Sequence, residues 1–308
     1  MFLWDNTIDN VISLTIAVTF DIIFGEYPTA IHPVVYFGFL SKFFDKHTQR
    51  CSSASERFVL GMVSEIFEIS FWLSIIFFVL GLRSNYYLIY IVLCSYLTKS
   101  TFAIKSLYTH VERCNVEDEK ILRQNVSMIV SRDTRNLSKQ HLYSAALESL
   151  AENFNDSVVA PIFYFLLFGL PGAVVYRIIN TYDALFGYRN QTYEWFGKLP
   201  ARLDDVANYI PARLSALIIS LFNFRNALKY IKLYGRLKIN GTYPMSAFAG
   251  VLSVGFEKIG MYRFEGKLPE KSDLKRGLKL YKNICSLWLF IVFLSYAVRI
   301  LLNAGGVI

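Results

Sequence analysis

The chain has 308 residues, of which 54% are hydrophobic and only 18% are charged, whereas soluble domains carry about 25% charged residues. With a positive mean hydropathy, this composition argues against a soluble domain. The net charge of +8 predicts contact with anionic lipid and no nucleic-acid partner, because the basic residues lie between apolar runs.

Six charge-poor runs approach the ~20 residues that cross a bilayer as a helix. The N-terminal run lacks a basic n-region and a small-residue cleavage site, so we expect a retained helix and no signal peptide. The shorter runs need their flanks to span, including Asp21 and Glu68. We predict an all-α, polytopic integral membrane protein with four to six transmembrane helices plus re-entrant or amphipathic cytoplasmic helices, forming one domain over residues 1–308. The six runs cover residues 10–20, 69–82, 86–98, 158–176, 206–224 and 283–298.

The placement of lysine and arginine predicts the orientation of the chain. None precedes Lys42, whereas four fall in residues 42–57, seven in 105–139, five in 225–238 and eight in 258–282. The positive-inside rule places these four segments in the cytoplasm and the N-terminus outside. We therefore expect a multi-pass protein of the cell membrane whose helical segment 105–157 is cytoplasmic.

Runs 158–176 and 206–224 allow two interpretations. Both span the membrane and place residues 180–202 outside, or both are re-entrant or broken and keep those residues inside. Irregular backbone at membrane depth is tolerated where protein buries it or where it lines a wet cavity. Breaking residues in the two runs favour interruption: Pro161, Gly169, Pro171, Gly172 and Pro211.

An acidic helix face follows a predicted cytoplasmic helix over residues 116–130. Ser138 is a good N-cap for a helix that reaches about Asn153. On this helix Glu148 and Glu152 are four residues apart, and Asp156 continues their face. Like charges at this spacing repel, so the face favours a bound cation, either magnesium or arginine, while a solvated surface remains the alternative.

A second acidic pair begins another predicted helix. Asp204 and Asp205 are followed one turn later by Asn208. Magnesium usually takes one or two carboxylates together with substrate phosphate and water. The pair therefore predicts a metal site, and an N-cap followed by ordinary polar residues is the alternative.

Arginines lie within or beside these acids. The planar guanidinium suits phosphate and carboxylate groups bidentately, and Arg213, inside an apolar run, predicts a functional or buried-pair role. Asp133, next to Arg132, is compatible with a structural turn. His32-Pro33 belongs to a polar, kinked segment, where an interfacial histidine is more common than a catalyst. The arginines in question are Arg132, Arg189, Arg202 and Arg213.

Motifs of soluble nucleotide and metal sites are absent from the sequence. There is no P-loop, no dinucleotide fingerprint and no His-Glu-x-x-His. The four cysteines lack the paired spacing of a zinc site or a disulfide framework.

An ordered set of motifs resembles the CobD or CbiB family of cobalamin biosynthesis proteins, the adenosylcobinamide-phosphate synthases, over nearly the whole chain. Residues that differ from the family's motifs, such as Ser131 and Phe154-Asn155, concern the exact substrate and not the family. The set comprises Gly25-Glu26-x-Pro28 with His32-Pro33, Arg132-Asp133-Thr134, Glu148-Ser149-x-Ala151-Glu152-Asn153, Asn180-Thr181-x-Asp183, Gly187-Tyr188-Arg189-Asn190, Ala201-Arg202-Leu203-Asp204-Asp205, Pro211-Ala212-Arg213 and Asn240-Gly241-x-x-Pro244.

The resemblance implies an ATP-dependent amide ligase that joins adenosylcobyric acid, a corrinoid, to (R)-1-amino-2-propanol O-phosphate or a related aminoalcohol phosphate. It implies ATP and Mg²⁺, a site facing the cytoplasm, and a homo-oligomer or an assembly with later membrane enzymes of cobalamin synthesis. ATP would activate the carboxylate as an acyl phosphate. Phosphoryl transfer needs charge neutralisation by magnesium and basic side chains. The acids would bind the magnesium, and the arginines would bind the phosphates.

These patterns predict three sets of site residues. The catalytic set is Glu148, Glu152, Asp183, Arg189, Arg202 and Arg213. The substrate-binding set is His32, Arg132, Asp133, Asn153, Asn180, Tyr188, Asn190, Asn208 and Asn240. The metal set is Glu148, Glu152, Asp156, Asp204 and Asp205.

Two other classes are compatible with acids and arginines in a membrane protein. One is a magnesium-dependent transferase of the CDP-alcohol or prenyl type, but its aspartate arrays are absent. The other is a transporter with interrupted helices, which usually shows two related halves, and no internal repeat is found.

Overall fold

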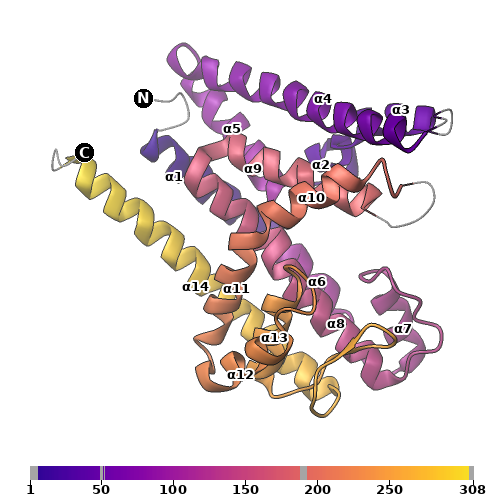
Figure 1. Ribbon diagram of the computed structural model, residues 1–308. Coiled ribbons are helices and arrows are strands. Elements are labelled where there is room, and N and C mark those ends of the chain that lie inside the picture. Colours follow the sequence, from indigo (N-terminus) through magenta and orange to yellow (C-terminus); the bar gives the residue numbers. More distant parts are fainter. Residues whose placement is uncertain (1–5, 49–50, 52, 188–192, 305–308) are drawn as a thin grey trace. The chain divides into compact units, whose positions relative to one another are not determined.

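A computed structural model describes residues 6–48, 51, 53–187 and 193–304. Over these residues the protein is helical apart from one short hairpin (Figure 1). The helices are α1 (Thr7–Phe24), α2 (Pro33–Tyr36), α3 (Phe39–Thr48), α4 (Ala54–Gly81), α5 (Tyr87–Thr101), α6 (Lys105–Glu112), α7 (Glu119–Ser127), α8 (Lys139–Phe154), α9 (Ala160–Phe186), α10 (Lys198–Ala207), α11 (Tyr209–Ser220), α12 (Phe224–Tyr234), α13 (Thr242–Leu252) and α14 (Lys271–Ala304). Shorter elements are the 3-10 turns η1 (Thr29–Ile31) and η2 (Leu82–Ser84), the π-helical turn η3 (Asn155–Val159), and the strands β1 (Glu257–Lys258) and β2 (Tyr262–Arg263).

Five helical segments in the described chain are long and apolar enough to cross a membrane. Their number confirms the predicted four to six spans. The run 206–224 does not form such a segment, because α11 has 12 residues and is about 18 Å long, short of the ~30 Å hydrocarbon core. The five segments are Thr7–Phe24, Ala54–Ser84, Tyr87–Glu112, Lys139–Phe186 and Lys271–Asn303.

The chain divides into two compact units. Unit 1 comprises Met1–Ala103, Ala160–Ala207 and Phe293–Ile308, and unit 2 comprises Ile104–Val159 and Asn208–Val292. That the whole chain acts as a single membrane domain stays a prediction.

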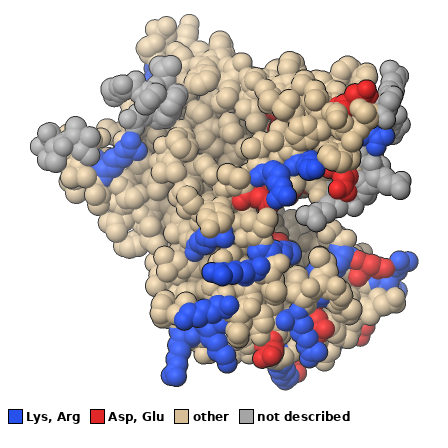
Figure 2. Space-filling view, in the orientation of Figure 1, with Lys and Arg blue, Asp and Glu red and all other residues tan. Residues whose placement is uncertain are grey.

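In unit 1, α9 packs against α4, α5 and α10, while α1 packs on α5 and α3 on α4 (Figure 1). Large apolar side chains on the outside of these helices are exposed, such as Leu88 at 76%, Phe78 at 70% and Phe24 at 68%. Much of the surface over α4 carries neither acids nor bases (Figure 2). An apolar face of this extent is costly in water, so it is a lipid-facing surface.

The backbone of α9 is broken at Gly169, as the glycines and prolines of its sequence predict. Gly169 has φ 64° and ψ −155°, and Pro171 follows inside the same helix. This conformation is essentially confined to glycine. The predicted interruption of run 158–176 is therefore present, and it separates two helical pieces within α9.

Four ionisable side chains of unit 1 form a connected group. Lys99 of α5 and Asp21 of α1 are both fully buried, with Nζ 3.1 Å from Asp21 Oδ1 and 3.3 Å from Glu26 Oε2. Glu26 in turn contacts His32, whose Nε2 lies 2.6 Å from Glu26 Oε2. Charges beside a lipid core are retained where they face protein and pair, and this chain of four groups meets that condition.

In unit 2, α8 lies at the centre and most of its side chains are buried. As predicted, Ser138 caps the helix, since its hydroxyl accepts a hydrogen bond from the backbone N–H of His141. Helix α13 packs against α8, α11 and α12. In the face shown in Figure 2, lysine and arginine gather over α11, α12 and α13.

The orientation of the protein in the membrane stays a prediction, which labelling of intact cells can test. A single cysteine introduced near Asn136 should be protected from a membrane-impermeant reagent, and one near Asn6 should react. The reason is the excess of basic residues in segment 105–139, which retains that segment in the cytoplasm. The reverse labelling pattern would contradict the predicted orientation.

Candidate active site

Glu148 of α8 is buried and accepts hydrogen bonds from three side chains. Its Oε2 lies 2.6 Å from Arg132 Nη2 and accepts a hydrogen bond of 2.6 Å from the Tyr262 hydroxyl. Its Oε1 accepts a hydrogen bond of 2.7 Å from Ser144 Oγ. The sequence left magnesium and arginine open as the cation on this face, and the structure places Arg132 beside Glu148. Burial and the neighbouring carboxylate raise the pKa of the Tyr262 hydroxyl, which therefore stays a donor.

Glu152, one turn further along α8, is only partly buried. Its Oε1 lies 3.2 Å from Lys238 Nζ, and 37% of its side chain is exposed. The turn at Asn240–Gly241 approaches so closely that a Cβ at Gly241 would collide with the Glu152 carboxylate. A glycine at this position therefore lets the loop before α13 close over the acidic face of α8.

Arg213 of α11 reaches the same turn. Its Nη1 donates a hydrogen bond of 3.1 Å to Asn240 Oδ1. Its guanidinium lies between two rings, 3.5 Å from the centroid of Tyr209 and 4.2 Å from that of Tyr243. Stacking of this kind fixes the plane of a guanidinium. The functional or buried-pair role expected for Arg213 stays a prediction.

Basic charge exceeds acidic charge around these two glutamates. Lys258 of β1 is close enough to Lys238 and Arg132 for their charges to act on it, as well as to Glu148 and Glu152. Burial, followed by the repulsion of Lys238 and Arg132, lowers the pKa of the Lys258 ammonium. Three cations against two carboxylates leave one positive charge in excess, which favours an anionic ligand.

Asn155 connects the π-helical turn η3 to α11. Its Nδ2 donates hydrogen bonds of 2.8 Å to both Asp156 Oδ1 and Asn208 Oδ1, and its Oδ1 accepts one of 3.0 Å from Ser215. Asn208, predicted to bind substrate, thus holds this buried network. A π-turn inside a helical segment often marks a functional position. In the sequence, the only indication of this turn was that Phe154-Asn155 departs from the family motif.

Other predicted substrate contacts have protein partners. Asn153 donates a hydrogen bond of 2.9 Å to the carbonyl of Ser149. Asp133 pairs with Arg135 at 2.7 Å, and hydrogen bonds from the Arg135 side chain and backbone lower the pKa of the Asp133 carboxyl to about 2. Both sets of contacts lie within a few residues along the chain and indicate a role in local structure. A substrate contact for either residue stays a prediction.

His32 uses both ring nitrogens within its own segment. Nδ1 accepts a hydrogen bond of 3.2 Å from the Val34 N–H and caps α2, so the proton lies on Nε2 and faces Glu26. Although burial acts in the opposite direction, the His32 hydrogen bond and the Lys99 charge hold the pKa of Glu26 below its usual value. The arrangement stabilises the turn after α1, and a substrate contact for His32 stays a prediction.

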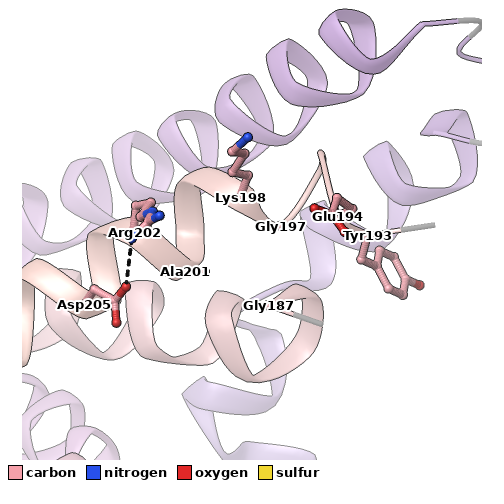
Figure 3. A pocket seen from close by; sticks show the side chains of 8 residues that line it. All are labelled: Gly187, Tyr193, Glu194, Gly197, Lys198, Ala201, Arg202 and Asp205. Atoms are coloured by element: carbon pink, nitrogen blue, oxygen red, sulfur yellow. Dashed lines mark ion pairs between the residues drawn. The ribbon is translucent and has the colours of Figure 1, made fainter. Parts of the chain in front are cut away.

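The remaining described candidates lie in unit 1. Asn180 of α9 donates a hydrogen bond of 3.2 Å to Asp204 Oδ1 of α10. On α10, Arg202 Nη1 lies 3.6 Å from Asp205 Oδ2. A pocket of about 310 Å³ opens beside this pair (Figure 3). Tyr188, Arg189 and Asn190 lie outside the described residues.

The lining of this pocket combines bases, acids and closely packed glycines. Lys198, Arg202 and Asp205 follow one another on α10, and Figure 3 shows the ion pair between the last two. The pocket is lined by Gly187, Tyr193, Glu194, Gly197, Lys198, Ala201, Arg202 and Asp205.

Within the described residues, no group of three or more histidines, cysteines or acids is arranged to hold a metal ion. The predicted ligands fall in both units, with Glu148, Glu152 and Asp156 in unit 2 and Asp204 and Asp205 in unit 1. Both oxygens of Glu148 already accept hydrogen bonds, whereas the Glu152 side chain is 37% exposed. Magnesium binding by any of these acids stays a prediction.

The fold and the site define a helical, multi-pass membrane protein with a charge-dense site around Glu148 and Glu152. The family model of the CobD/CbiB protein matches residues 14–284. The chain therefore belongs to the CobD/CbiB family of cobalamin biosynthesis proteins, as the ordered motifs predict.

Relatives of the chain align along almost their whole length. The chain is 49% identical over 294 residues to a probable cobalamin biosynthesis protein CobD of Pyrococcus abyssi, covering 95% of this chain and 98% of the relative. It is 48% identical over 284 residues to the protein of the same name in Thermococcus kodakarensis, covering 92% and 94%. A cobalamin biosynthesis protein CobD of Dehalococcoides mccartyi is 35% identical over 303 residues, covering 92% and 97%. No solved structure matches the chain.

Proposed function

We propose that this protein catalyses the ATP-dependent amide ligation of adenosylcobyric acid with an aminoalcohol phosphate, giving adenosylcobinamide phosphate. The aminoalcohol phosphate is (R)-1-amino-2-propanol O-phosphate or a close relative. Family membership supports a step of cobalamin biosynthesis. The observation that carries the proposal is the excess of basic charge around Glu148 and Glu152, since ATP brings phosphate groups that need such charge.

The chemistry requires activation of a carboxylate, which is a poor acyl donor. An oxygen of the corrin propionate attacks the γ-phosphorus of ATP, the bond to the β,γ-bridging oxygen breaks, and ADP leaves with that electron pair. The neutral amine then attacks the acyl carbon, the C–O bond to phosphate breaks, and the amine proton passes to a base. The products are the amide, ADP and inorganic phosphate.

Basic residues of unit 2 have defined tasks in this proposal. Lys238 and Lys258 bind the phosphates of ATP, and Arg132 keeps its pair with Glu148 while contributing positive charge. Arg213, held in plane by two tyrosines, orients the Asn240 amide, next to Gly241, which packs against Glu152. Magnesium, when bound through Glu152, would neutralise charge that develops on the transferring phosphoryl group.

The test is reconstitution with purified protein. In detergent, with adenosylcobyric acid, aminopropanol phosphate, ATP and magnesium, the protein should form adenosylcobinamide phosphate together with ADP and phosphate in equal amounts. Formation of AMP and pyrophosphate would overturn the acyl-phosphate route. Equal ATP consumption without a corrinoid carboxylate would overturn it as well, and failure to bind any corrinoid would overturn the proposed reaction.

The affinity for a non-hydrolysable ATP analogue should fall with rising pH because of Lys258. Burial and two neighbouring cations favour its neutral form, so Lys258 loses its charge at a lower pH than an ordinary lysine. Binding is therefore strongest below this pKa and weakens as the pH rises through it. Titration calorimetry between pH 7 and 10 measures the effect, and Lys258→Arg, which stays charged, should remove it. A parent protein whose affinity is as independent of pH as that of the variant would contradict this role.

A further inference from the structure

Helix α12 carries a row of basic side chains on its outer face. Arg225, Lys229 and Lys232 recur at helical spacing, and all three are exposed. Within the described residues, no ion pair joins any of them to an acid, and the sequence from residue 206 to residue 256 contains six bases and no acid. Like charges at this spacing repel one another, so the row favours an anionic ligand.

The opposite face of α12 is fixed to protein. Ala227 is fully buried, and a Cβ at Gly250 of α13 would lie only 2.8 Å from its Cα. Two tyrosines of α12 hydrogen-bond to the backbone of Glu265. The Tyr230 hydroxyl donates to the Glu265 carbonyl at 2.9 Å, and the Glu265 N–H donates to the Tyr234 hydroxyl at 3.0 Å. With this face occupied, the basic row faces away from α13 and is open to a partner.

Helix α11, which directly precedes α12, exposes an apolar stripe. Ile210, Leu217 and Leu221 lie on one helical face and are exposed by 61%, 54% and 59%. Such a stripe is costly in water. Because the 12 residues of α11 are too few to cross a bilayer, the stripe suits partial immersion in lipid.

Exposed apolar side chains also flank the basic row of α12. Phe224 directly precedes Arg225, and Leu233 directly follows Lys232. Apolar groups beside bases are typical of a helix that lies at a membrane–water interface, where the apolar groups reach the acyl chains and the bases reach the phosphates. A nucleic acid or an acidic protein would match the bases but would leave the apolar stripe of α11 without a partner.

The turn after α12 leads to the candidate active site. Thr242 closes this turn, because its hydroxyl donates a hydrogen bond of 2.7 Å to the Gly235 carbonyl and accepts one of 3.0 Å from the Lys238 N–H. Lys238 Nζ in turn lies 3.2 Å from Glu152 Oε1. A ligand held on α12 is therefore one hydrogen-bonded turn away from the Glu152 ion pair.

We propose that Arg225, Lys229 and Lys232 bind the phosphate groups of anionic phospholipids, with α11 partly immersed among the acyl chains and α12 at the level of the headgroups. The bound lipid restrains the turn that carries Lys238. This assignment goes beyond the proposed reaction and does not depend on it.

The test measures lipid binding to the purified protein in detergent by native mass spectrometry. Dioleoyl phosphatidylglycerol, which is anionic, is compared with dioleoyl phosphatidylcholine, which has the same acyl chains and no net charge. The parent protein should prefer phosphatidylglycerol at least about tenfold, since each base near an anionic surface contributes about fivefold to binding. The triple variant Arg225→Gln/Lys229→Gln/Lys232→Gln should lose this preference.

Helix α14 supplies a matched control. Lys275, Lys279 and Lys282 repeat the spacing of the α12 row and are exposed, but on this described helix no large apolar side chain before Phe290 is exposed. Lys275→Gln/Lys279→Gln/Lys282→Gln removes the same charge and should keep the preference. Leu217→Asn/Leu221→Asn should weaken both lipids and also preserve the preference.

Equal loss of preference in the two triple variants would overturn the site, because the number of bases and not this surface would then set lipid binding. Displacement of the lipid by soluble glycerophosphoglycerol, or tighter binding of a soluble oligonucleotide, would overturn it in favour of a soluble polyanion. If the triple variant does not fold, Lys229→Gln/Lys232→Gln carries the same expectation.

Hydrogen exchange tests the restraint of the turn. Amide exchange in residues 235–241 should slow when phosphatidylglycerol is added to the parent protein, and it should not change in the triple variant or with phosphatidylcholine. Unchanged exchange in the parent would overturn the restraint. None of these measurements uses amide formation, so failure of the lipid site and failure of the proposed reaction are separate results.

Discussion

Glu152→Gln should lower the turnover of amide formation by about 10²–10³-fold, the usual cost of removing one group that stabilises charge in a transition state. Glutamine keeps the shape of the side chain but removes the charge that faces Lys238 and any bond to magnesium. The protein should remain folded and inserted in the membrane, because Glu152 is partly exposed and its ion pair is not enclosed.

Turnover is measured by the release of phosphate and the formation of the corrinoid product. Glu119→Gln is a matched control, since Glu119 is an exposed acid of unit 2 that pairs with Arg123 on the surface of α7. Its variant should retain parental turnover. Turnover of Glu152→Gln within a factor of two or three of the parent would rule out an essential role for this carboxylate.

Lys99→Met should destabilise the folded protein by about 3–5 kcal/mol, the cost of removing one partner from a buried ion pair. Methionine fills a similar volume, but Asp21 would remain fully buried without its cation. The loss of Lys99 would cost less free energy at Glu26, because Glu26 is partly exposed and still contacts His32. Thermal unfolding in a single detergent, followed by tryptophan fluorescence, measures the loss.

A second variant separates charge from packing. The double variant Lys99→Met/Asp21→Asn removes both members of the pair, so it should regain most of the stability that the single variant loses. Equal destabilisation of the single and double variants would show that packing around Lys99, and not its charge, sets the effect.

Several site residues could not have been found from local sequence. Tyr262 and Glu148 are 114 positions apart, and Lys258 reaches the acidic face of α8 only through the short hairpin that carries it.

Some predicted residues have partners that the pattern did not specify. The acidic face of α8 was predicted to attract a cation. In the structure, Arg132 forms an ion pair with Glu148, and Lys238 forms one with Glu152. Helical spacing places two carboxylates on one face, but it does not say which loop will cover them. The closing loop depends on Gly241, whose missing side chain allows contact with Glu152.

By itself, the sequence determined the class of this protein, its family, the Ser138 cap and the break in the run 158–176, because composition, capping and glycine or proline interruptions act over a few neighbouring residues. The tertiary structure decided which charges meet. Burial in a membrane protein makes an unpaired charge costly, and the packing of distant helices decides which charges find a partner. It pairs Lys99 with Asp21 and Arg132 with Glu148, and it leaves the buried Glu65 without a hydrogen-bonding partner among the described residues.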